Sequence, residues 1–200
     1  DWGPVIGGYL ACLLLAAAYA ALGLWISALT DNAIVALLAT AVAGGLLYLA
    51  GSPVLLGLTP EPWTGLLRAI GSGSRFESIE RGVIDLRDLV YYGSLCALFL
   101  LLTVYALDRK RWGQGAGAAQ HRRAMTARVA LLGANLLVIN LWLAPLTGLR
   151  VDATAGREYT LAPATRDLLA TLREPLLIRA YISQQSHPLL DPLRPQVEDL

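Results

Sequence analysis

The sequence has 200 residues, of which 56% are hydrophobic and 16% are charged, and its mean hydropathy is +0.53. This composition is typical of a membrane protein and argues against a soluble domain. The net charge of +1 gives no reason to expect nucleic-acid binding, because the charges are segregated along the chain rather than in excess. We expect the chain to be a piece of a longer protein, since it starts without Met and ends within an apparent helix.

Four charge-free apolar runs predict membrane-spanning helices, because about 20 apolar residues cross ~30 Å of hydrocarbon as a helix. The first two are separated by a polar break in which Thr30 or Asp31 is expected to cap the second helix. In the fourth, Asn135 and Asn140 are expected to hydrogen-bond to neighbouring helices. The predicted spans cover about residues 4–29, 33–56, 89–107 and 129–149.

The second predicted span contains helix-weakening residues in its second half, namely Gly44-Gly45, Gly51-Ser52 and Pro53. Lipid tolerates a broken helix only where protein or a water-filled cavity satisfies the freed backbone groups. We therefore expect the end of this helix to pack inside a bundle. The following residues, Gly71-Ser72-Gly73-Ser74, are expected to be flexible.

Residues 71–92 form the one charged and patterned segment of the apolar first half. Apolar residues recur there at steps of three and four, which predicts an amphipathic helix at the membrane surface that continues into the third span. Tyr91 and Tyr92 are expected to act as interfacial anchors. The helix is either a gate or a simple interfacial brace, and the candidate gate residues are Arg75, Phe76, Glu77, Glu80, Arg81, Asp85 and Asp88.

Charge predicts the orientation of the chain. Residues 108–128 form a polar loop with a balance of +5, whereas segments 58–88 and 149–200 each have a balance of −1. Because basic residues mark cytoplasmic loops, we expect loop 108–128 inside and segments 58–88 and 150–200 outside. Residue 1 is then outside, and an odd number of spans must precede it if the intact protein starts in the cytoplasm. The basic loop could also contact anionic lipid, although a plain topology signal is the simpler role. The topology determinants are Arg109, Lys110, Arg111, Arg122, Arg123 and Arg128.

After Arg150 the composition changes to that of a soluble domain. Strands are expected at residues 151–154 and 176–182, and helices at 163–172 and from 193, an order that suggests the start of an α/β domain. The predicted fold class is therefore mostly α: a polytopic membrane helix bundle with four spans and one amphipathic interfacial helix, followed by the start of an extracytoplasmic α/β domain.

The sequence offers few side chains that could act in catalysis or bind a cofactor. His121 and His187 lie outside the predicted spans, which argues against haem ligation in the membrane and leaves Ser94 without a base for proteolysis. No charge lies deep in a span, which disfavours an ion or proton relay. No GxxxxGK[ST] phosphate loop is present, so nucleotide hydrolysis would need another chain. We expect no catalytic, metal-binding or cofactor-binding residue on this chain.

Residues 1–112 carry a series of short blocks in a characteristic order and spacing. They are Asp1-Trp2-Gly3, Gly8-Tyr9-Leu10, residues 27–32 (SALTDN), residues 74–79 (SRFESI), residues 81–85 (RGVID), residues 88–92 (DLVYY) and the terminal residues 108–112 (DRKRW). These blocks resemble the second half of an ABC type-2 transporter permease of the gliding-motility-associated group.

Residues 126–200 resemble the beginning of the companion auxiliary protein, the Gldg family. The resemblance rests on a membrane helix followed by Arg150, Asp152, Thr154, Tyr159-Thr160-Leu161, Pro163, Thr165, Leu168-Leu169, Leu172, Pro175, Ile178, Tyr181 and Ser183. One departure is Ala162, where such proteins often carry a Ser; the lost helix cap is worth about 1 kcal/mol.

The two resemblances imply a fusion of two normally separate components. Residues 1–112 would be the C-terminal half of the permease membrane domain, holding the last three of six helices. Residues 113–125 would be a cytoplasmic linker, 126–149 a membrane anchor helix, and 150–200 the beginning of the extracytoplasmic auxiliary domain.

The resemblance implies a transport permease of the bacterial inner membrane and not an enzyme. It would move an unknown substrate by ATP-driven alternating conformations, with ATP and Mg on a separate ATP-binding-cassette ATPase subunit. Further implied partners are a second permease, as a homodimer or a pair, and membrane lipid. The alternative is a membrane-anchored scaffold whose external domain engages a polymer or protein without transport, and a membrane enzyme is a third, weaker reading.

Overall fold

The protein is seen in a computed structural model, which describes residues 2–52, 55, 58–111, 116–144, 146, 149–157 and 159–171. These residues are mostly helical. The helices are α1 (Gly3–Leu29), α2 (Ala33–Leu49), α4 (Glu61–Ile70), α5 (Gly73–Glu80), α6 (Leu86–Arg111), α7 (Ala116–Leu143) and α8 (Pro163–Ala170), and the strands are β1 (Val83–Asp85) and β2 (Arg150–Asp152).

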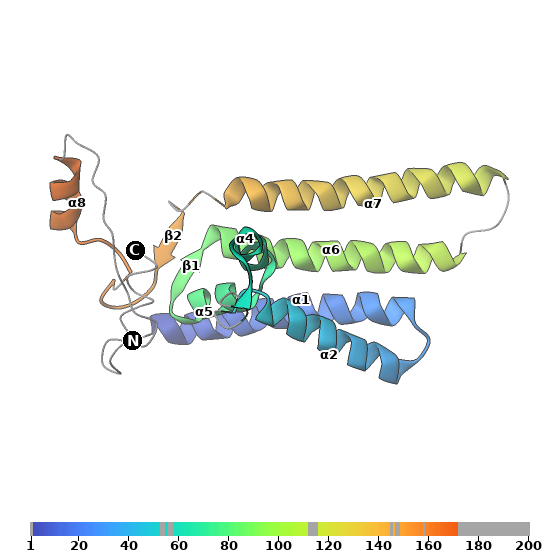
Figure 1. Cartoon of the computed structure of the whole chain (residues 1–200), viewed down its shortest axis with the longest axis horizontal. Coiled ribbons are helices and arrows are strands. Elements are labelled where there is room, and N and C mark those ends of the chain that lie inside the picture. Colours follow the sequence, from blue (N-terminus) through green and yellow to red (C-terminus); the bar gives the residue numbers. More distant parts are fainter. Residues whose placement is uncertain are drawn as a thin grey trace.

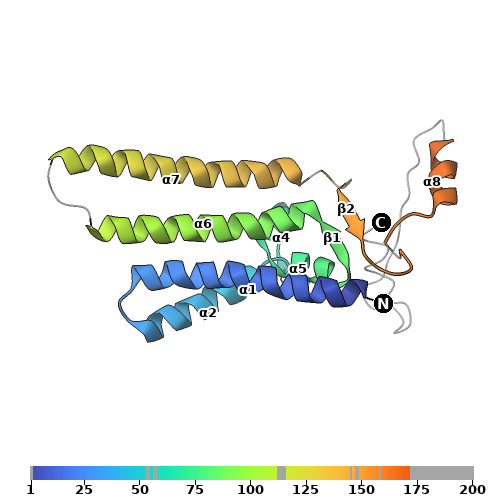
Figure 2. The same cartoon turned by 180° about the vertical axis from the view of Figure 1, so that it is seen from behind.

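The long helices α1, α6 and α7 run side by side along the molecule (Figure 1). Helix α1 packs against α2, α5 and α6, and α6 in turn packs against α7. The start of α1, α5, both strands and α8 gather at one end of this bundle, whereas the α1–α2 turn, the end of α6 and the start of α7 lie at the other end (Figures 1 and 2). The segments that charge assigns to one side of a membrane thus share one end of the bundle.

Among the residues that the structure describes, three helices are long and apolar enough to cross a membrane: Gly3–Leu29, Leu86–Arg111 and Ala119–Leu143. They confirm the prediction of a mostly helical chain with membrane-spanning helices, and the first predicted span matches α1. The second predicted span, 33–56, is wrong in its length. Helix α2 ends at Leu49 after 17 residues, about 25 Å of helix, which falls short of a hydrocarbon core.

Large apolar side chains cover the outside of the bundle. Tyr9 is 78% exposed on α1, Leu37 70% on α2, and Leu141 and Trp142 69% each on α7. An exposed apolar surface that continues over three helices is unfavourable in water and favourable in lipid. It therefore agrees with a protein embedded in a membrane.

The predicted polar loop 108–128 is wrong, because most of it is helical. Residues 108–111 complete α6, and α7 begins at Ala116; only residues 112–115 lie outside the described residues. The low-complexity composition suggested a linker, but Ala, Gln, Arg and Met all favour helix. The fourth predicted span also differs from 129–149, since α7 ends at Leu143.

Of three predictions about polar side chains, the one for Asn140 is confirmed and the other two are wrong. Asn32 caps α2, its Oδ1 accepting from the amides of Ile34 at 2.9 Å and Val35 at 3.3 Å, so the expected cap by Thr30 or Asp31 is wrong. Asn140 donates to Ser94 Oγ of α6 at 2.7 Å, as expected for an amide between membrane helices. Asn135 instead donates to the Leu131 carbonyl of its own helix.

The tail begins as predicted, with strand β2 and helix α8. β2 pairs antiparallel with β1, with Val83 opposite Asp152 and Asp85 opposite Arg150. The sequence did not predict β1. The strand expected at 176–182 and the helix expected from 193 lie outside the described residues.

Small residues let α1 approach its neighbours closely. Ala11 and Ala18 are completely buried in the core, together with Ile79 of α5 and Tyr92 of α6. A Cβ atom at Gly7 would overlap the carbonyl oxygen of Ile79. Glycine at this position is therefore what allows α5 to lie against α1.

Gly7 and its neighbour Gly8 provide a matched test of this packing. Gly7→Ala is expected to lower the free energy of unfolding by about 1–3 kcal/mol, because backbone must move to make room. Gly8→Ala should leave stability unchanged or raise it by up to about 1 kcal/mol, because a Cβ there meets nothing within 4 Å. Thermal unfolding in detergent would measure both, and equal effects would contradict the packing.

Candidate functional site

Residues 71–92 do not form the single amphipathic helix that their periodicity predicts. Helix α5 ends at Glu80, a turn follows, and β1 separates it from α6, which begins at Leu86. Gly82 has φ +88°, a left-handed conformation that glycine adopts without strain. Val83 and Ile84, read as part of a helical face, instead pair with β2, a partner that local periodicity cannot reveal.

Helix α5 lies along α1 and not across the end of the bundle. At its start, Ser72 Oγ is 2.8 Å from the hydroxyl of Tyr19, and near its end Ile79 packs on Gly7. Tyr19 and Gly7 are about 18 Å apart along α1, so α5 runs antiparallel to α1. Figure 2 shows α5 beside the N-terminal part of α1, at the end of the bundle that also carries the strands.

The turn before α5 is buried deep between the helices. Gly71, Ser72 and Gly73 are all buried, and a Cβ at Gly71 would overlap the backbone of Gly51. The flexibility expected for these residues is wrong, because their small size serves close packing. The expectation that the end of α2 packs inside a bundle is confirmed, since the Ser72 amide donates to the Leu47 carbonyl at 3.0 Å.

Three tyrosine hydroxyls satisfy carbonyl groups around this break in the helices. Tyr19 donates to the Gly44 carbonyl at 2.9 Å, Tyr92 donates to the Ser72 carbonyl at 2.7 Å, and Tyr91 donates to the Ile70 carbonyl. Tyr91 and Tyr92 are 6% and 0% exposed, so the prediction that they are interfacial anchors is wrong. Buried tyrosines combine a large apolar ring with a hydroxyl that needs a partner.

A buried ion pair joins α5 to α6 beside these tyrosines. Arg75 Nη1 donates to Asp88 Oδ1 at 2.6 Å, and the Asp88 side chain is 4% exposed. The guanidinium group also stacks over the Tyr91 ring, 4.3 Å from its centroid. Breaking a buried pair leaves an uncompensated charge, which costs about 3–5 kcal/mol, so this contact fixes the position of α5.

A second buried carboxylate holds the strand pair. The Asp85 side chain is 1% exposed, and its Oδ2 lies 2.8 Å from Nε of Arg87 and 3.9 Å from Nε of Arg150. Arg87 lies in the first turn of α6, while Arg150 belongs to β2. Asp85 therefore links the tail to the helix bundle.

The turn after β2 is held by Asp152, which accepts four hydrogen bonds. They come from the amide and hydroxyl of Thr154 at 3.0 and 2.6 Å, the Tyr159 amide at 2.9 Å and the Thr160 hydroxyl at 2.8 Å. Desolvation alone would raise the pKa of this carboxyl, but these donors outweigh it, and the pKa lies below its ordinary value. The carboxylate is thus built into the start of the tail.

The seven candidate gate residues separate into distinct places. Arg75 and Asp88 meet in the buried pair, and Asp85 lies at the strand junction. Phe76 packs against the core and meets the Tyr48 ring edge-on, while Arg81 follows the end of α5. Glu77 and Glu80 are exposed. Sequence reasoning missed Tyr19, Ser72, Arg87 and Arg150, although tyrosines within charge-free runs could have suggested buried hydroxyls.

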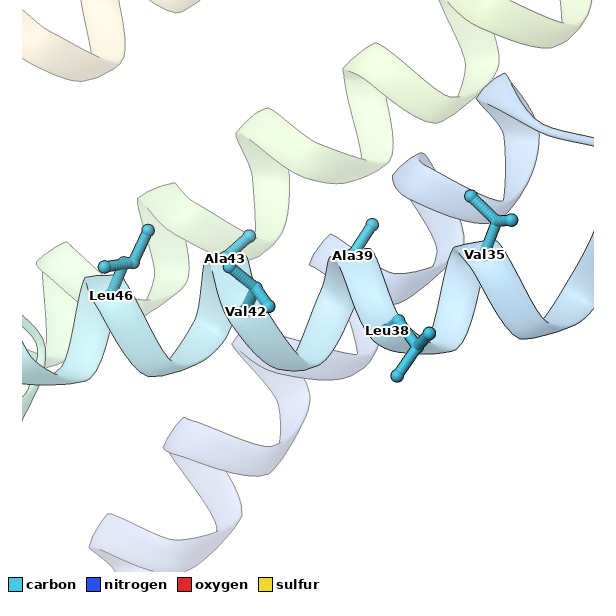
Figure 3. A pocket seen from close by; sticks show the side chains of 6 residues that line it. All are labelled: Val35, Leu38, Ala39, Val42, Ala43 and Leu46. Atoms are coloured by element: carbon cyan, nitrogen blue, oxygen red, sulfur yellow. The ribbon is translucent and has the colours of Figure 1, made fainter.

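Two shallow grooves lie on the helices. One follows α2 and is lined only by apolar side chains (Figure 3): Val35, Leu38, Ala39, Val42, Ala43 and Leu46. The other runs between α1 and α5, where Glu80 and Tyr9 provide polar groups beside Phe76. Among the described residues no group of three or more His, Cys, Asp or Glu could hold a metal ion. Both grooves suit apolar chains better than a polar reactant.

No family model matches the chain, and no match is found among curated proteins or solved structures. The buried contacts around α5 are therefore the basis for any functional assignment. They describe a site that holds helices in place.

The Arg75–Asp88 pair can be tested against an exposed carboxylate of the same segment. Asp88→Asn should lower the free energy of unfolding by roughly 3 kcal/mol, because the buried guanidinium loses its counter-charge. Glu77→Gln, on the exposed side of α5, should change it by less than about 0.5 kcal/mol. Thermal unfolding in detergent would measure the difference. Two equally mild variants would show that the pair does not fix α5.

Proposed function

We propose that the chain is a membrane permease component of an ATP-binding-cassette transporter with a fused extracytoplasmic auxiliary domain. The observation that carries this proposal is the interrupted apolar segment α2–α4–α5. Its breaks lie inside the bundle, where Tyr91 donates to the terminal Ile70 carbonyl of α4 and the Ser72 amide donates to the Leu47 carbonyl in the last turn of α2. Tyr19 and Tyr92 add hydrogen bonds to carbonyls on either side of the break. Interrupted helices at membrane depth are common where a transporter builds its pathway.

The proposed mechanism is two-state gating rather than bond chemistry. Helix α5 is attached to α6 through Arg75 and Asp88 and to α1 through close glycine packing at Gly7. A packed contact of this kind has discrete arrangements and is not continuously deformable. ATP binding by a separate ATPase subunit would shift which arrangement of α5 is populated.

The sequence resemblance gives this proposal its partners and location. The chain would sit in the bacterial inner membrane beside an ATPase subunit and a second permease. Its basic end, formed by the end of α6 and the start of α7, would be cytoplasmic. The opposite end, with α5, the strands and the tail, would be extracytoplasmic.

The rival proposal is a membrane-anchored scaffold without transport. The β1–β2 pairing and the Asp85–Arg150 contact favour it, because they attach the tail to the bundle. A tail held in a fixed position is useful in a binding protein as well as in a transporter. A scaffold has no need for an interrupted helix packed inside the bundle, which is why the permease is preferred.

The permease proposal predicts a physical partner with activity. The full-length protein, purified in mild detergent from its native membrane, should bring down an ATP-binding-cassette subunit. In lipid the complex should hydrolyse ATP, and a phosphate-loop Lys→Ala substitution in that subunit should abolish hydrolysis. A preparation that repeatedly lacks such a subunit and moves nothing across vesicles would favour the scaffold.

The orientation can be tested with single cysteines. The native Cys12 and Cys96 are free and would first be replaced by Ala. In intact cells an impermeant thiol reagent should label Ala162→Cys, near the start of the tail, and should not label Gln120→Cys near the start of α7. Both positions are exposed, so access to the reagent depends on the side of the membrane. The reverse pattern would contradict the orientation.

A further inference from the structure

The basic residues of α6 and α7 form one surface because the two helices are antiparallel neighbours (Figure 1). Two contacts set their register: Tyr105 OH lies 2.9 Å from Thr126 Oγ1, and Asn140 donates to Ser94 at 2.7 Å. At 1.5 Å per residue, Arg122 and Arg123 lie level with the end of α6. The basic surface consists of Arg109, Lys110, Arg111, Arg122, Arg123 and Arg128.

Few carboxylates of the protein lie close enough to the basic surface to compensate its positive charge. Lys110 lies 3.3 Å from Asp31, in an exposed pair. In the described parts of the chain no ion pair is found for the five arginines. Asp108 is the one acidic residue within positions 108–128. The surface therefore presents an uncompensated positive charge at one end of the bundle.

Arg128 lies deeper than the rest of the surface. The register places it level with residues 103–106 of α6, about 6–10 Å from the level of Lys110 towards the bundle centre. The charge-free part of α7 that follows, residues 129–143, spans only about 22 Å, against ~30 Å of hydrocarbon. A phosphate headgroup that approaches Arg128, or one that its extended side chain reaches, would compensate its charge at this depth.

We propose that this basic surface binds the phosphate headgroup of an anionic phospholipid. A guanidinium group suits phosphate because it can donate two parallel hydrogen bonds. An acidic protein could meet the ends of the helices, but Arg128 is exposed beside Leu131 and Leu132, which are 64% and 48% exposed. A lipid offers both an acyl chain for these leucines and a phosphate for Arg128. This inference does not depend on transport.

The test compares spin-labelled phosphatidylglycerol with spin-labelled phosphatidylcholine around the full chain, reconstituted in phosphatidylcholine vesicles. Electron paramagnetic resonance measures the fraction of each label that the protein immobilises. Wild type should prefer phosphatidylglycerol several-fold, since each basic residue at a membrane surface contributes roughly five-fold. The double variant Arg123→Gln/Arg128→Gln should lose most of this preference.

Two controls separate the proposal from a folding defect or a general charge effect. Arg157→Gln removes one exposed charge at the opposite end and should keep the wild-type preference. Arg123→Lys/Arg128→Lys keeps the charge and should keep most of it. The proposal is overturned if wild type shows no preference or if the double Gln variant retains it. If the double Gln variant retains the lipid preference but no longer binds an acidic protein that wild type binds, the surface is a protein-binding site instead.

Discussion

The need to satisfy backbone polar groups inside an apolar bundle determines much of this structure. Helices α2 and α4 end, and α5 begins, next to a turn that is buried within it, where lipid offers no hydrogen bonds. The carbonyls of Gly44, Ile70 and Ser72 are met by tyrosine hydroxyls, and the Leu47 carbonyl by an amide. The tyrosines that α1 and α6 bring to the interrupted segment therefore add to its backbone hydrogen bonds.

Helix α1 makes that arrangement possible because it is apolar and carries small side chains on the face that packs against α5. Its outer face carries exposed residues such as Tyr9 and Leu13, while Ala11 and Ala18 are fully buried. Small side chains bring the α5 backbone close enough for Tyr19 to reach Ser72. Helix α1 therefore positions α5 by shape, and the Arg75–Asp88 pair then attaches α5 to α6 by charge.

The tail is not an independent unit at the point where it leaves α7. Strand β2 pairs with β1, and Arg150 approaches the buried Asp85. Because β1 directly follows α5 and directly precedes α6, a displacement of β2 would bear on both helices. A mechanical link between the tail and the buried ion pair follows from this connectivity, whichever of the two proposed functions applies.

The sequence by itself determined the membrane class, α1, most of α6 and α7, and the short strand and helix that begin the tail, because hydropathy and composition are local properties. It also selected Arg75, Asp85 and Asp88 as notable residues. Only the tertiary structure decided how they act. The periodicity of residues 71–92 fits a helix, but Val83 and Ile84 meet a strand that begins at Arg150, and the partners of Ser72 lie on α1 and α6. Contacts between residues far apart in the chain leave no periodic trace, so neither the break in the helix nor the burial of Tyr91 and Tyr92 could be read from the sequence.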